Sequence, residues 1–236
     1  MNLIYLLQIV LTCIMLAHTS YLDIKKREVD LKIWAIYAPL VIFFVFNYPH
    51  LNLFLYLYSV ITVNLVMYFL YRFSMMGGAD LILSIILSLS NATTYPIFFP
   101  SLSSEGFEPF LIILYGSIII LLSGLVNLFR NLKYTKGYSL MVRLNLAISA
   151  KRIKVKDFLS SKFLFPLTVI DEKGNQNIRT SFDVEEDDEE WRKLYREYVE
   201  RGLIKEEDYI WVMWGVPVIP FFFIGYLISL VMGFPI

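Results

Sequence analysis

Long apolar segments are the feature of the chain that most constrains its fold. A helix needs about 20 apolar residues to cross a hydrocarbon core of ~30 Å. Six segments reach or approach that length: Leu3–Tyr21, Ile33–Phe46, Leu53–Tyr71, Leu81–Pro100, Phe110–Phe129 and Tyr209–Met232. The sequence therefore predicts an all-α polytopic membrane protein with six transmembrane helices.

Two of these segments contain residues that interrupt regular helices. In the fourth, Asn91 and Pro96 are poor helix formers, so we expect the chain to leave helical conformation near them. The last segment carries Pro217, Pro220 and Gly225, which predict a kinked helix.

The positions of Lys and Arg predict the orientation of the spans. They occur in the first connection, at Arg72, and then only between Arg130 and Lys205, whereas the connections 47–52 and 90–109 contain none. Six alternating spans place every cation on one side, which the positive-inside rule makes cytoplasmic. We therefore expect a multi-pass protein of the cell membrane with both termini outside.

A hydrophilic segment separates the fifth and sixth spans. The sequence thus divides into helices 1–5 at 1–129, a small α+β cytoplasmic insert at 130–208 and the sixth helix at 209–236. Alternating apolar and polar residues around Gly174 predict a β-hairpin. Trp191, Tyr195 and Tyr198 follow at helical spacing, and Gly202 is expected to end that helix.

Two acidic residues lie at the same predicted depth, at the cytoplasmic edge of the hydrocarbon. Asp23 follows the first span and Asp80 precedes the fourth. Packing of these two helices would bring the carboxyl groups into one site. Two adjacent carboxyl groups do not both ionise readily, so the pair holds a shared proton and can activate water while polarising a carbonyl group.

The stretch before Asp80 is rich in small residues. Gly77 and Gly78 allow backbone conformations closed to other residues and permit close approach of a substrate strand. Simpler roles stay open at this point: Asp80 as a helix N-cap, and Asp23 as a partner of Lys26 or Arg27.

Composition argues against several other classes of site. A single cysteine, Cys13, excludes an internal disulfide and a cysteine-rich zinc module. The two histidines, His18 and His50, are expected at opposite ends of the bilayer, so we predict no metal site. The formal net charge of zero gives no reason to expect a nucleic-acid partner.

The segment "SYLDIKKREVDLKIW" together with "GGAD" resembles the GxGD-type membrane aspartic proteases, and among them the archaeal prepilin and preflagellin peptidases, or class III signal peptidases. The proline-containing "WGVPVIPFFFIGYL" is also similar to the last helix of that family. The resemblance implies that Asp23 and Asp80 are the catalytic pair. It assigns Gly77, Gly78 and Ala79 to the substrate loop, with Ala79 where the family has glycine.

The same resemblance implies a substrate. It is the precursor of a pilin, archaellin or related surface protein, in which a short basic segment precedes an apolar helix. Proteolysis without methylation and without a cofactor is implied, because no cysteine-rich domain or methyl-donor site is evident. Glu28, Asp30 and Arg72 are candidates for positioning the substrate.

Two other functional classes are compatible with a membrane protein of this composition. A transporter using paired acids as an ion or proton site would place them near the middle of the membrane and often shows repeated halves. Neither feature is predicted here. A catalytically inert assembly platform would tolerate substitution of both acids, whereas a protease would not.

Overall fold

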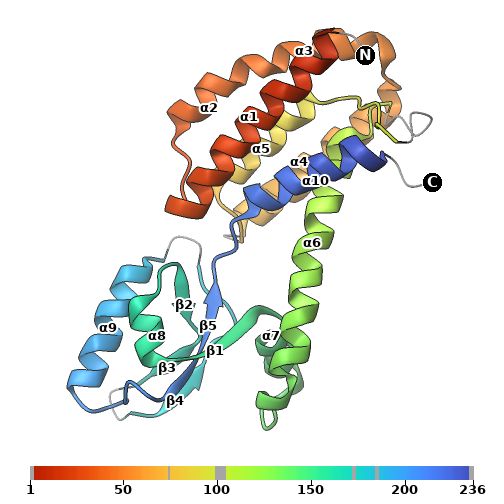
Figure 1. Cartoon of the computed structure of the whole chain (residues 1–236). Coiled ribbons are helices and arrows are strands. Elements are labelled where there is room, and N and C mark those ends of the chain that lie inside the picture. Colours follow the sequence, from red (N-terminus) through yellow and green to blue (C-terminus); the bar gives the residue numbers. More distant parts are fainter. Residues whose placement is uncertain (1–2, 74, 99–104, 172–173, 184–185, 234–236) are drawn as a thin grey trace. The chain divides into compact units, whose positions relative to one another are not determined.

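The chain forms two compact units. The computed structural model describes residues 3–73, 75–98, 105–171, 174–183 and 186–233. One unit, called here the helical unit, comprises Met1–Ile120 and Pro217–Ile236; the other, the α/β unit, comprises Leu121–Val216. Figure 1 shows the long helix α6 (Glu108–Asn131), which belongs to the first unit at its start and to the second at its end.

Besides the first part of α6, the described residues of the helical unit form six α-helices. They are α1 (Leu3–Lys26), α2 (Leu31–Tyr37), α3 (Phe43–Asn47), α4 (Leu53–Arg72), α5 (Gly78–Ser90) and α10 (Val218–Met232). A 3-10 turn over Ala38–Ile42 joins α2 to α3. The two short helices therefore follow one another as a single segment, Leu31–His50, which is apolar enough to cross a membrane.

Four helical segments among the described residues are long and apolar enough to span a bilayer: Leu3–Lys26, Leu31–His50, Leu53–Arg72 and Glu108–Tyr134. Of the six transmembrane helices predicted, four correspond to these segments. The fourth and sixth predicted spans are the shorter apolar helices α5 and α10. At 1.5 Å per residue, α5 extends only about 20 Å.

A buried polar network explains why α5 ends where it does. Its C-cap is Asn91, a fully buried residue whose carboxamide exchanges hydrogen bonds with Thr12 of α1 and accepts one from Gln8. Asn47 of α3 donates to Gln8 and accepts from Thr93. The segment after Ser90 was correctly predicted to be non-helical, and its buried polar groups find partners inside the protein, as apolar surroundings require.

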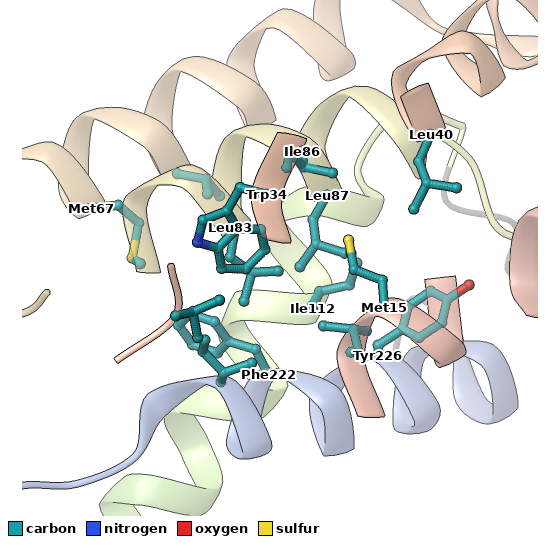
Figure 2. Packing of buried hydrophobic residues seen from close by; sticks show 14 of the residues in the cluster. Met15, Trp34, Leu40, Met67, Leu83, Ile86, Leu87, Ile112, Phe222 and Tyr226 are labelled. Carbon is teal, nitrogen blue, oxygen red and sulfur yellow. The ribbon is translucent and has the colours of Figure 1, made fainter. Parts of the chain in front are cut away.

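The core of the helical unit joins helices that are distant in sequence. Figure 2 shows Met15 of α1, Leu83 and Leu87 of α5, Ile112 of α6 and Phe222 of α10 converging on one another. Each is at most 2% exposed. This packing holds α1, α5, α6 and α10 together around one core.

The described residues of the α/β unit form two small antiparallel sheets and three α-helices besides the end of α6. Its elements are α7 (Leu140–Ser149), β1 (Ala150–Lys154), α8 (Val155–Ser160), β2 (Leu164–Pro166), β3 (Thr168–Ile170), β4 (Gln176–Ile178), α9 (Asp188–Glu200) and β5 (Tyr209–Trp214). Strand β5 lies between β1 and β2, with Ala150 opposite Met213 and Leu164 opposite Trp214.

The hairpin and the helix predicted in this region were confirmed. Strands β3 and β4 pair around Gly174, which has φ +83°. Helix α9 buries Tyr195 against α8 and ends before Gly202, which has φ +70°.

The prediction that the last helix begins at Tyr209 was wrong. Residues 209–214 pair with two strands as β5, and α10 begins at Val218 after Pro217. An apolar strand buried in a sheet has the same hydropathy as the start of a membrane helix, so hydropathy alone did not separate them.

Candidate active site

Asp23 lies near the C-terminal end of α1, which runs on to Lys26. Its Oδ2 accepts a hydrogen bond of 3.2 Å from the backbone N–H of Ile219 at the start of α10. The N-cap of α10 is Pro217, which has no side-chain oxygen to bond the free N–H groups of the first turn. The carboxylate of Asp23 supplies such an acceptor from another helix.

Asp80 lies in the first turn of α5, three residues after the N-cap Gly77. Its Oδ2 accepts a hydrogen bond of 3.2 Å from the N–H of Gly77, and its own N–H donates to the Gly77 carbonyl. Asp80 is therefore not the N-cap itself but a residue that reaches back to it. The side chain is only 8% exposed.

The two carboxyl groups lie close enough for the charge of Asp23 to act on Asp80. Asp23 is also within electrostatic reach of Arg27, which follows α1 with φ +58°. Helix α10 packs against both α1 and α5. Asp23 and Asp80, 57 positions apart in sequence, thus lie at the ends of two helices of one packed unit, α1 and α5. Arg27 is the cation nearest to Asp23 in sequence on its C-terminal side that acts on its charge.

The glycines before Asp80 do not use the conformational freedom expected of them. Gly77 has φ −76° and ψ 157°, which any residue can adopt. A Cβ atom at Gly77 would lie 3.8 Å from Asp80 Oδ2, and one at Gly78 would lie 3.5 Å from Tyr71, both ordinary contacts. Gly77 therefore borders the Asp80 carboxyl group without a side chain of its own, and Gly78 faces the ring of Tyr71.

The remaining predicted residues lie around this pair without joining it. Glu28 and Asp30 are exposed in the connection after α1, and Asp30 caps α2 by accepting a hydrogen bond from the Lys32 N–H. Arg72 is exposed at the end of α4, and among the described residues no ion pair links it to Asp80. Ala79 is partly buried against the helical core.

Sequence reasoning missed the backbone N–H of Ile219. Its only signal was the proline-bounded start of the last helix, because a backbone donor has no residue type of its own. In the described part of the chain, no three His, Cys, Asp or Glu side chains gather as a metal site would require.

Comparison with known families bears on both units. Residues 10–129 match the type IV leader peptidase family, and residues 142–234 match the archaeal peptidase A24 C-terminus, type II. No curated protein matches the chain. The resemblance drawn from the two Asp-containing segments is confirmed at the level of the family. Because the first match covers more than half of its residues, the chain belongs to the type IV leader peptidase family and is an aspartic endopeptidase of prepilin-leader type.

Proposed function

We propose that this peptidase removes the short basic leader from precursors of archaeal pilins, archaellins and related surface proteins, at the cytoplasmic boundary of the membrane. In such a precursor the basic segment stays in the cytoplasm, and the bond that joins it to the apolar helix lies at that boundary. Asp23 and Asp80 occupy helix ends, which is where a cleavage site at this depth would be accessible to water.

The catalytic groups in this proposal are Asp23 and Asp80, and the observation that supports it most is that α10 packs against both helices that carry them, with Asp23 hydrogen-bonded to its start. The pair holds one proton between its members. The ionised carboxylate removes a proton from water as the water attacks the scissile carbonyl, and the protonated member donates a hydrogen bond to the carbonyl oxygen. The proton then passes to the leaving amine as the C–N bond breaks.

The distribution of cations supports the same orientation. All Lys and Arg lie in the connections that six alternating segments would leave on one side, so we place the active site and the α/β unit in the cytoplasm and both termini outside. The exposed acids Glu28 and Asp30 follow Asp23 closely, which suits contact with the basic leader. Gly77 borders the Asp80 carboxyl group, and we assign the Gly77, Gly78 and Ala79 segment to the loop that an extended substrate approaches.

Cleavage of a defined precursor in membranes containing the full chain tests this function. The precursor carries a basic segment followed directly by an apolar helix, and a matched precursor carries a secretory signal cleaved after its apolar run. We expect cleavage of the first only, at the junction of its basic and apolar parts. Mass spectrometry of the product locates the bond and reports N-methylation, which we expect to be absent.

Cleavage of the secretory precursor at equal rate, or of neither precursor by folded protein, would contradict the proposed substrate class. Moving the basic segment ten residues away from the apolar helix provides an internal control. The cleaved bond should then stay at the edge of the apolar helix, since the depth of the dyad decides which bond is reached.

The hydrogen bond from Ile219 to Asp23 predicts a loss of turnover when the donor is removed. Ile219→Pro deletes that N–H in the first turn of α10, where proline is best tolerated. A hydrogen bond to a charged group contributes about 1.5–3 kcal/mol. We therefore expect kcat to fall roughly 10- to 100-fold, with KM nearly unchanged because the donor acts on Asp23 rather than on the substrate.

Two matched variants separate this role from simple loss of packing. Ile219→Ala removes the buried side chain but keeps the N–H, and Val218→Pro introduces the same ring one residue earlier and leaves the Ile219 donor intact. Both should retain kcat within about threefold of the parent. Equal losses in Ile219→Pro and Ile219→Ala would assign the effect to packing.

A further inference from the structure

Helix α7 of the α/β unit exposes an apolar face. Leu140, Met141 and Leu144 recur at helical spacing and are 73%, 80% and 45% exposed. The opposite face is buried, with Leu146 packed in a cluster around the central sheet. An amphipathic helix normally buries its apolar face against another element. In the described part of the chain, no element covers this face of α7.

Helix α7 is fixed to the last turns of α6. The side chain of Asn131 donates hydrogen bonds to the carbonyl oxygens of Leu146, Ala147 and Ala150, at 3.4, 3.2 and 2.6 Å. A Cβ atom at Gly124 would lie 3.2 Å from Ile148, so the two helices approach closely. These turns of α6 belong to a membrane-spanning segment and are themselves apolar and exposed. The free face of α7 is therefore held beside a helix that enters the bilayer.

The chain around α7 carries a strong positive charge. Residues 130–156 contain Arg130, Lys133, Lys136, Arg143, Lys151, Arg152, Lys154 and Lys156, and no acidic residue. Only Lys154 and Lys156 form ion pairs among the described residues, both with Glu207. The other six cations have no ion-pair partner among the described residues.

Aromatic side chains interleave with these cations. The guanidinium group of Arg152 lies 4.5 Å from the ring centroid of Tyr209 and 5.0 Å from that of Tyr134. The Lys151 ammonium lies 5.1 Å from the ring of Trp214. Tyrosine and tryptophan are enriched where a membrane surface meets water, because each joins an apolar ring to a polar group.

We propose that the α7 surface binds anionic phospholipids of the membrane that α6 enters. This surface comprises the exposed apolar residues of α7, the cations Lys133 and Arg152, and the rings of Tyr134 and Tyr209 beside them. The apolar residues enter the boundary between headgroups and acyl chains, and the cations contact lipid phosphates. A second copy of the chain carries the same cations and would repel them, so charge favours the lipid. The inference does not rest on the peptidase reaction.

Lipid-phase quenching of a label on α7 tests this surface in the full chain. A fluorophore is attached at Met141→Cys in a Cys13→Ala background, and the protein is reconstituted into vesicles whose lipids carry an acyl-chain nitroxide. We expect about threefold stronger quenching in vesicles containing phosphatidylglycerol than in pure phosphatidylcholine. The difference should diminish as salt screens the charges.

A charge-matched pair of variants identifies the cations responsible. Lys133→Glu with Arg152→Glu should abolish the difference between the two kinds of vesicle. Lys193→Glu with Arg196→Glu, the same change on exposed positions of α9, should preserve it. Quenching independent of lipid charge and of salt would overturn the proposal. So would a label shielded from both lipid and water, because it would mean that protein covers α7. If the reversed-charge variant fails to fold, the salt dependence of quenching in the parent chain still tests whether charge attracts α7 to the lipid.

Discussion

Asp23→Asn and Asp80→Asn are each expected to lower the rate of precursor cleavage by about 10³-fold, within the range that general acid–base catalysis contributes. The amide is nearly isosteric with the carboxyl group but neither shares the proton nor accepts one from water. Its oxygen can still accept the hydrogen bond from Ile219 or from Gly77 that the parent side chain receives. The loss of activity should therefore occur without loss of the helix ends that these bonds support. The measurement is single-turnover cleavage in membranes containing equal amounts of folded, inserted protein.

Asp157→Asn provides the control for this pair. Asp157 is an exposed acid on α8 in the α/β unit, so the same chemical change there should leave cleavage unaltered. The double variant Asp23→Asn, Asp80→Asn should be no slower than either single variant, because groups that act as one unit are not additive. Cleavage by either single variant within tenfold of the parent rate would remove that residue from the catalytic pair.

Gly225→Ala is expected to disrupt the helical unit. A Cβ atom at this position of α10 would lie 2.3 Å from the carbonyl oxygen of Ile112 and 2.7 Å from the backbone N of Gly116, both on α6. Backbone atoms within a helix cannot rotate away as a side chain can, so the two helices must separate. Overpacking costs about 1–3 kcal/mol, and a contact with backbone lies at the upper end or beyond. We expect a fall of about 10 °C or more in the unfolding temperature of the solubilised chain, given the several degrees that each kcal/mol shifts.

Gly124→Ala is the matched substitution in α6. The added methyl group there would meet a side-chain methyl of Ile148 at 3.2 Å, which a small adjustment relieves, and alanine favours the helix by about 1 kcal/mol over glycine. The unfolding temperature should hence change by only a few degrees. Equal losses in the two variants would show that the close α6–α10 crossing is not what makes Gly225 necessary.

The architecture was predictable where hydropathy has one interpretation. Leu53–Tyr71 and Phe110–Phe129 lie within α4 and α6, because a long uniform apolar run has few alternatives to a spanning helix. The segment from Tyr209 has two alternatives, and pairing with β1 and β2 decides it. Those partners lie more than 40 residues upstream, so no local pattern reveals them.

Sequence reasoning singled out the two candidate acids for a different reason. Charge in an otherwise apolar frame is costly, so Asp23 and Asp80 stood out as residues that need a function. The unusual backbone conformation expected at Gly77 is not present. Residue type alone does not show whether a glycine serves through its backbone conformation or through its lack of a side chain. The Ile219 donor depends on where α10 begins, and that start in turn depends on the sheet. Both the start of α10 and the position of the Ile219 donor therefore depend on contacts between segments distant in the sequence.

The contact between Asp23 and Ile219 has a consequence for biosynthesis. Ribosomes complete the segment bearing Asp23 long before they reach α10, which lies 196 positions later in the polypeptide. A nascent chain already containing both acids still lacks the donor that orients one of them. The arrangement of Asp23 seen here can therefore form only after the ribosome has made α10.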